Sequence, residues 1–248
     1  MSLARHRRDW EELAAYDALW AVLTDAGKRG GRWDAEEFLA TGEAEVAAVL
    51  ARLDELGLPR ARRAALDFGC GAGRLTRALA GRFERAVGID IAAGMVDAAR
   101  RLNDDVANVE FHVNDAPDLR RFDDGAFDLV YTSLVLQHVP GRALIEAYLR
   151  ELVRVTAPGG ALVAALPVRI ALPYRLGVAR RAYVALRWLR VPERTLLERT
   201  PLTPMRMTAV PEARVRAVVA EAGGTVAAVD ATAGAGVRTL RYVIVRDG

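Results

Sequence analysis

A glycine-rich loop at residues 69–73 constrains the fold of this 248-residue chain more than any other feature. An apolar run at residues 64–68 leads directly into the Gly-x-Gly-x-Gly turn, and a helical pattern begins at Leu75. In α/β folds, a buried strand, a tight loop and a helix N-terminus in this order receive an adenosyl cofactor at the carboxyl end of the sheet. Glycine is needed there because a Cβ would clash with a ligand pressed against the backbone. The stretch therefore predicts a cofactor site on a parallel sheet.

Two acids indicate which cofactor this is. Asp67 precedes the first glycine by two residues, where it can accept a hydrogen bond from a cationic amine. Asp90 ends the next expected strand, residues 86–90, roughly 20 residues on, where a ribose diol is bound. A dinucleotide fingerprint would place its third glycine at position 74, which is Arg74 here. A ligand with a ribose and an ammonium group but no pyrophosphate, such as S-adenosylmethionine, fits this pattern better than NAD.

Residues 64–166 resemble a class I S-adenosylmethionine-dependent methyltransferase, with several motifs in that family's order. These are the glycine loop, the acid at position 90, Asn114-Asp115-Ala116, the strand 127–132 and the turn Ala157-Pro158-Gly159-Gly160. The resemblance implies methyl transfer to an O, N or C nucleophile of a small molecule, with S-adenosylhomocysteine as the product. It also implies a set of cofactor-binding residues: Asp67, Gly69, Cys70, Gly71, Gly73, Asp90, Ile91, Met95, Asn114, Asp115, Ala116, Ser133 and Leu134.

Alternating strand and helix patterns predict an α/β fold with a doubly wound, mostly parallel sheet. The resemblance implies seven strands, with the last one antiparallel between its neighbours, in a Rossmann-like methyltransferase fold. We divide the chain into an N-terminal helical lid at residues 1–60 and a cofactor-binding methyltransferase domain at residues 61–248. Within that domain, residues 167–208 form an insert after the fifth strand that caps the substrate.

The N-terminal segment contains helical patterns at residues 9–26 and 34–56. In many related methyltransferases such a segment folds over the cofactor, so Trp33, Phe38 and Thr41 are candidate substrate contacts. The alternative is that the aromatic side chains pin these helices to the core.

The insert is rich in arginine, and residues 173–191 predict one basic amphipathic helix. Tyr174, Arg175 and Tyr183 are candidate substrate contacts on it. Three roles are open: a pocket cap, a binding surface for an acidic or lipid-linked acceptor, and contact with an anionic membrane surface. The alternative is a solvated arginine face over a packed apolar face.

His138 is the sole histidine expected near the catalytic face. It is a candidate substrate contact and a candidate general base, because a neutral imidazole can deprotonate a hydroxyl at physiological pH. The alternative is a structural role in its loop.

Composition excludes several other classes. A net charge of +3 is too small for a general nucleic-acid surface, and the three histidines and one cysteine form no metal-ligand spacing. No apolar run approaches the length of a membrane span, and no secretory signal is visible. We expect a bacterial, cytoplasmic enzyme of small-molecule or natural-product biosynthesis, and the oligomeric state is open. Two other functions remain alternatives: a non-catalytic cofactor-binding partner subunit, and an NAD-dependent oxidoreductase.

Overall fold

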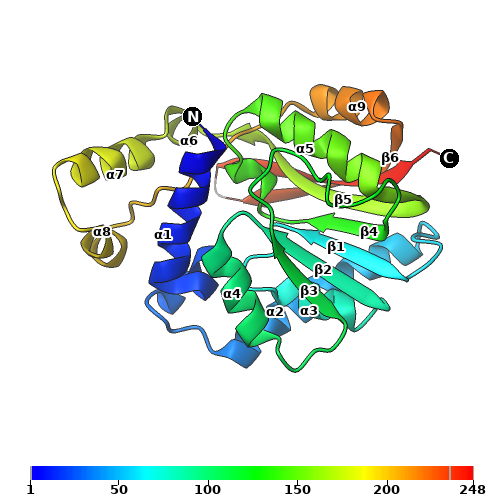
Figure 1. Cartoon of the computed structure of the whole chain (residues 1–248). Coiled ribbons are helices and arrows are strands. Elements are labelled where there is room, and N and C mark those ends of the chain that lie inside the picture. The colour runs from blue at the N-terminus through cyan, green and yellow to red at the C-terminus, as the bar shows by residue number, and fades with distance from the viewer. Residues whose placement is uncertain (1, 235, 248) are drawn as a thin grey trace.

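In the computed structural model, which describes residues 2–234 and 236–247, seven strands form one sheet in the order β3-β2-β1-β4-β5-β7-β6 (Figure 1). The strands are β1 (Ala64–Phe68), β2 (Arg85–Asp90), β3 (Val109–Val113), β4 (Phe127–Thr132), β5 (Thr156–Ile170), β6 (Gly224–Gly234) and β7 (Val237–Arg246). The first five strands are parallel, and β7 runs antiparallel between β5 and β6. The predicted seven-stranded, mostly parallel sheet is confirmed.

The strand order reverses between β1 and β4, the two central strands. Both are almost completely buried along their length, as expected for parallel strands covered on both faces. Ligands of open α/β sheets bind outside the carboxyl ends of the strands at such a reversal. The glycine loop follows β1 at this point.

Helices cover both faces of the sheet (Figure 1). On one face lie α5 (Arg142–Val155) and α9 (Glu212–Glu221), and on the other α2 (Ala35–Asp54) and α3 (Arg74–Ala80). The inward side of α2 contributes Val46, Val49, Leu50 and Leu53 to the core. The helix α2 is therefore a layer of the sheet domain, and only α1 remains a candidate lid within residues 1–60.

The helix α1 (Leu3–Val22) crosses in front of the carboxyl edge of the sheet, between α4 (Ala93–Leu102) and the insert (Figure 1). It begins six residues earlier than the sequence pattern predicts. At Asp17 its backbone is extended (φ −166°), and the Asp17 carboxylate accepts hydrogen bonds from the N–H groups of Trp20, Gly30 and Gly31. This carboxylate ties the turn that contains η1 (Ala26–Lys28) back against α1.

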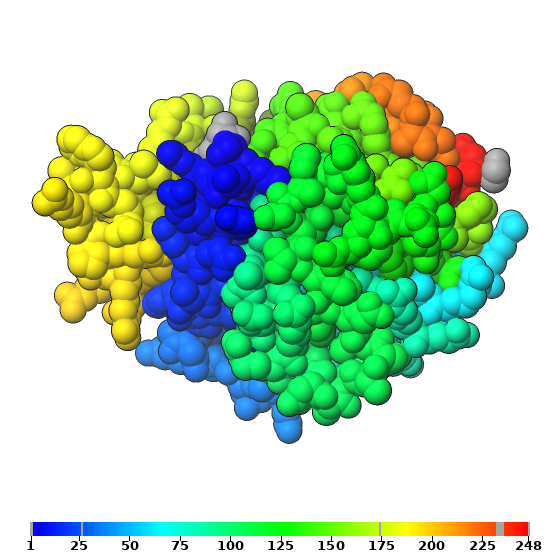
Figure 2. Space-filling model, in the orientation of Figure 1, coloured from blue at the N-terminus to red at the C-terminus, as the bar shows by residue number. Residues whose placement is uncertain are grey.

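The insert forms a lobe beside α1 (Figures 1 and 2). The expected single helix at residues 173–191 is divided at Gly177, whose φ of +60° is left-handed. The result is α6 (Leu172–Leu176) and α7 (Val178–Trp188), followed by α8 (Glu193–Arg199). No helix in the described part of the chain is long and apolar enough to cross a membrane.

Candidate functional site

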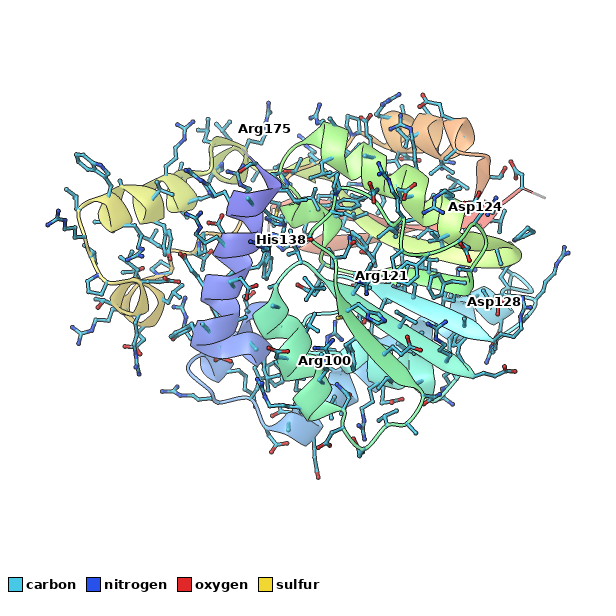
Figure 3. All side chains as sticks on the ribbon, in the orientation of Figure 1. Arg100, Arg121, Asp124, Asp128, His138 and Arg175 are labelled. Carbon is cyan, nitrogen blue, oxygen red and sulfur yellow. The ribbon has the colours of Figure 1, made fainter. Side chains whose placement is uncertain are left out.

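A cavity of about 710 Å³ lies at the carboxyl ends of the central strands, between the glycine loop, α1, η2 (Leu136–His138) and the insert. The side chains that converge on it come from segments far apart in the sequence. Figure 3 shows two of them: His138 beside α1, and Arg175 on α6. The cavity therefore joins the predicted cofactor loop to the predicted substrate cap.

The glycine loop adopts a backbone that other residues disfavour. Gly69 and Gly71 have φ angles of +78° and +53°. A Cβ on Gly71 would lie 2.4 Å from a methyl group of Val22, and one on Gly69 would lie 2.3 Å from Val135. The missing side chains thus allow α1 and the segment after β4 to approach the loop closely, which narrows the cavity around any bound ligand.

Asp90 is held at the cavity wall by the backbone. Its Oδ2 accepts a hydrogen bond from Gly71 N–H at 3.0 Å, and its Oδ1 accepts one from Ala92 N–H at 2.9 Å. Burial raises the pKa of Asp90 to about 6, and these backbone donors oppose the rise. Each carboxylate oxygen keeps a second lone pair that can accept a ligand hydroxyl.

Asp67 lies below the loop rather than in the cavity wall. It is buried, and its Oδ2 accepts a hydrogen bond from Thr76 Oγ1 at 2.7 Å. Its Oδ1 has no hydrogen-bond partner among the described residues. An acceptor without a partner, directly under the loop, fits the predicted interaction with a cationic amine, although the side chain does not line the cavity.

Most of the predicted cofactor residues line the cavity: Gly69, Cys70, Gly71, Asp90, Ile91, Met95, Asn114, Ser133 and Leu134. Burial raises the pKa of the Cys70 thiol, so it stays protonated and acts as a small apolar side chain. Gly73 does not line the cavity, because it packs under Phe111 and Asn103.

Asp115 and Ala116, which were expected to contact the cofactor, do not line the cavity. The Asp115 carboxylate is exposed and pairs with Arg7 of α1 at 2.7 Å. The carbonyl of Ala116 accepts a hydrogen bond from the hydroxyl of Tyr148, a residue that lines the cavity from α5. Only Asn114 of this triplet faces the cavity.

The predicted substrate contacts divide in the same way. Trp33, Phe38 and Thr41 do not line the cavity: Phe38 is fully buried, Trp33 donates to the carbonyl of Leu23, and Thr41 donates to the carbonyl of Phe38. Tyr183 is also buried and packs toward α1. In this structure these aromatic side chains pack between helices. Arg175 does line the cavity, whereas the side chain of Tyr174 lies outside the described part of the structure.

His138 lines the cavity with a defined tautomer. Its Nδ1 lies 2.5 Å from the carbonyl oxygen of Arg206, so this nitrogen carries the proton and donates. Its Nε2, 3.1 Å from Gln137 Nε2, is then the acceptor. Burial lowers the pKa of His138, so the ring is neutral at physiological pH.

The first helix contributes cavity residues that the sequence did not indicate. Leu3, His6 and Trp10 line the cavity, and the Trp10 ring meets the His138 ring edge-on at 5.5 Å between centroids. Burial and the nearby His138 and arginines lower the pKa of His6 to about 4. Trp10 stands near the start of the helical pattern predicted at residues 9–26, whereas Leu3 and His6 precede that pattern and showed no signal of their own.

Positive charge gathers where the insert meets the cavity. Arg175, Arg180, Arg181 and Arg206 all line it, while Asp90 is the one acid among its described lining residues. Arg180 pairs with Asp9 of α1 at 3.1 Å. Arg74, at the position that departs from a dinucleotide fingerprint, is buried and pairs with Glu45.

Comparison with known proteins agrees with this geometry. Residues 66–164 match the family model of a methyltransferase domain. The 2-methyl-6-phytyl-1,4-hydroquinone methyltransferase of Synechocystis is 30% identical over 165 residues, which cover 66% of this chain and 50% of that protein. The ubiquinone biosynthesis O-methyltransferase of Thiobacillus denitrificans is 33% identical over 127 residues, which cover 51% and 53%. The chain thus spans about half the length of these curated relatives.

Solved structures show the same fold over nearly the whole chain. The N-methyltransferase NodS from Bradyrhizobium japonicum, in complex with S-adenosylhomocysteine, aligns with a TM-score of 0.64 at 18% identity and covers 98% of this chain and 99% of that one. The magnesium protoporphyrin IX methyltransferase from Synechocystis aligns with a TM-score of 0.62 at 20% identity, covering 97% and 98%.

Fold and family match point to one class: residues 66–164 match a methyltransferase domain, and the chain shares its fold with methyltransferases of known structure that bind S-adenosylmethionine or S-adenosylhomocysteine. Several of the curated relatives are named for small-molecule acceptors, among them a hydroquinone and tocopherol.

Proposed function

We propose that this protein transfers the methyl group of S-adenosylmethionine to an O, N or C nucleophile of a small molecule. The observation that carries the proposal is the Asp90 carboxylate, fixed at the cavity wall by Gly71 N–H and Ala92 N–H. A carboxylate in this position, at the end of the second parallel strand, suits a ribose diol.

The residues around Asp90 fit the rest of the cofactor. Asp67 Oδ1, a buried acceptor without a partner among the described residues, suits the ammonium group. Ile91 and Met95 line the cavity and would give the adenine an apolar surface, and the glycine loop lines the part of the cavity that suits the methionine end. When bound, S-adenosylmethionine supplies a methyl carbon that its sulfonium has already activated.

The chain itself contributes mainly position. Holding the acceptor nucleophile in line with the methyl carbon can remove several kcal/mol from the barrier (about 7–11 kcal/mol in the best intramolecular cases). The helix α1 and the segment around His138 lie over the cavity and hold its walls in place.

We infer that the acceptor carries an acidic group. Four arginines line the cavity where the insert meets it, against one described acid. A guanidinium group binds carboxylate or phosphate through two parallel hydrogen bonds.

We further infer that His138 removes a proton when the nucleophile is a hydroxyl. The hydrogen bond to the carbonyl of Arg206 keeps the proton on Nδ1 and leaves Nε2 as the basic atom. The Gln137 amide, 3.1 Å from Nε2, has to give way to the acceptor hydroxyl for this transfer. The acceptor proton would then move to Nε2 as the methyl group is transferred.

Calorimetric titration with S-adenosylhomocysteine and, separately, NAD tests the proposal. We expect S-adenosylhomocysteine to bind and Asp90→Asn to weaken it at least tenfold, since charge-assisted hydrogen bonds contribute about 1.5–3 kcal/mol. Asp97→Asn, an exposed acid on α4, is the matched control. Binding of NAD alone would favour the oxidoreductase alternative. Tight S-adenosylhomocysteine binding without methylation of any phenol or hydroquinone in an acceptor screen would favour the non-catalytic partner.

A further inference from the structure

The insert exposes an unusual amount of apolar side chain. Seven large hydrophobic side chains are strongly exposed among the described residues, and six of them lie between residues 172 and 189. Trp188 is the most exposed of these, at 84%. We call these six the insert surface: Leu172, Leu176, Val178, Val184, Trp188 and Leu189. Soluble monomers normally scatter exposed apolar residues singly, and a concentrated patch marks an interaction site.

The helix α7 is apolar on both sides. Tyr183 and Leu186 pack inward in the same cluster as Leu13 and Trp20 of α1. Val178 and Trp188 face outward, on the side that also carries Arg181. Since the inward side alone satisfies the packing of this helix, the outward side is available for a second apolar partner.

Positive charge is interleaved along the chain with the residues of the insert surface. Residues 171–192 contain five arginines and no acid. Arg175, Arg181 and Arg190 form no ion pair with any described residue. Uncompensated arginines interleaved with tryptophan and leucine are typical of helices that lie in the interface of an anionic bilayer.

The insert surface also borders the cavity. Leu176 and Val178 are exposed and line the cavity at the same time, together with Arg175 and Arg181. The lobe that carries them projects from the side of the sheet domain (Figures 1 and 2). A surface pressed against the lobe would therefore lie at the cavity mouth.

We propose that the insert surface docks on an anionic lipid bilayer, and that a lipid-soluble acceptor passes from the bilayer into the cavity past Leu176 and Val178. The docking follows from the apolar and charged side chains alone, whereas the passage of an acceptor rests on the proposed methyl transfer. A protein partner is the disfavoured occupant, because Arg175, Arg181 and Arg190 carry positive charge that no acid among the described residues pairs, which suits an anionic lipid surface.

Co-sedimentation of the full chain with vesicles tests the docking. We expect binding to vesicles of equal parts phosphatidylcholine and phosphatidylglycerol, weak binding to phosphatidylcholine alone, and loss at about 0.5 M NaCl. Trp188→Ser combined with Leu189→Ser should weaken binding about tenfold or more. Neither residue lines the cavity, so the S-adenosylhomocysteine affinity of this variant should match the wild type.

The charge contribution is tested at Arg190, whose φ of +62° is left-handed. Arg190→Asn removes the charge without added backbone strain, because asparagine tolerates this conformation. We expect about a fivefold loss of vesicle binding. Arg120→Asn, at a side chain 87% exposed and far along the chain, is the matched control and should have no effect. Trp188→Phe should keep vesicle binding while removing the blue shift of fluorescence that accompanies it.

Three outcomes would overturn the proposal. One is absence of binding to anionic vesicles in a protein that binds S-adenosylhomocysteine. Another is vesicle binding that the Trp188→Ser, Leu189→Ser variant leaves unchanged. The third is a wild-type protein that forms dimers in solution and does not bind vesicles, and whose dimers this variant converts to monomers. That result would show that the insert surface contacts a second copy of the chain. Vesicle binding in a protein that fails to bind S-adenosylhomocysteine would instead contradict the proposed methyl transfer and leave the docking intact.

Discussion

Asp67 and Thr76 are joined by a hydrogen bond of 2.7 Å beneath the glycine loop, with the threonine hydroxyl donating to Oδ2. The carboxyl group is only 1% exposed, and burial raises its pKa to about 7, against the opposing effects of Thr76 and Arg74. Asp67 is therefore an acid held near its titration point at the base of the cofactor loop.

This relationship predicts a pH-dependent stability. The folded-state pKa lies above the ordinary value of 3.8, so the folded state binds the proton more tightly between about pH 4 and pH 7. The protonated carboxyl group stabilises the folded state by up to about 4 kcal/mol. This stabilisation is complete below about pH 4 and is lost as the pH rises through 7. Asp90 adds an effect of the same sign, because its pKa is raised to about 6. In urea titrations, the free energy of unfolding of Asp67→Asn should fall less than that of the wild type as the pH rises from about 5 to about 8. The free energy of unfolding of Asp97→Asn should fall as much as that of the wild type.

Gly42→Ala should destabilise the protein, although helix propensity alone predicts that this substitution stabilises it. A Cβ at this position of α2 would lie 2.3 Å from the carbonyl oxygen of Arg74. Gly→Ala in an open helix gains about 1 kcal/mol, but here α2 and α3 must separate, at a cost of roughly 1–3 kcal/mol. Gly81→Ala is the matched control, since its nearest atom lies 3.6 Å away. Equal melting temperatures for the two variants would contradict the close approach.

The cofactor loop could be predicted because its determinants are local. The strand β1 pairs with β2 in parallel, so the residues that follow β1 meet the residue that ends β2, and Gly71 reaches Asp90 for that reason. The spacing of a glycine loop and an acid along the sequence encodes this geometry directly. The alternating strand and helix patterns predicted the mostly parallel sheet in the same local way, whereas the seven strands and the antiparallel β7 were expected from the family resemblance.

The walls of the cavity could not be predicted because their determinants are long-range. The first turns of α1 are arginine-rich and show no apolar period, yet Arg7 pairs with Asp115 and Asp9 pairs with Arg180, which fixes them over the cavity. Conversely, Phe38 looked available in sequence but is buried by the packing of α2. Neither fact follows from the segment's own residues.

Glu11 holds α1 against the first turn of α4. Its carboxylate accepts hydrogen bonds from Ala93 N–H at 2.7 Å and Gly94 N–H at 3.0 Å, in the first turn of α4, where Ala92 provides no side-chain cap. Glu11→Gln removes the charge opposite the helix dipole, which should cost about 1 kcal/mol. We expect faster hydrogen exchange in α1 and several-fold weaker S-adenosylhomocysteine binding. Glu43→Gln, at an exposed position of α2, should change neither quantity.

Two substitutions and a pH profile distinguish a general-base role of His138 from a purely structural role. Asparagine can keep the donor to the Arg206 carbonyl but has no basic atom at the position of Nε2, so His138→Asn preserves the loop contact alone. If His138 is the base, this variant should lose about 10²–10⁴-fold in kcat/KM with a hydroxyl acceptor while still binding S-adenosylhomocysteine.

Because burial lowers the pKa of His138 from 6.5, the wild-type rate should be level at physiological pH and fall only in more acidic solution, and the variant should lack this acid limb. Gln137→Ala, which frees Nε2, should reduce the rate by no more than a few-fold. A His138→Asn enzyme within a few-fold of the wild type would assign His138 to the structure of its loop.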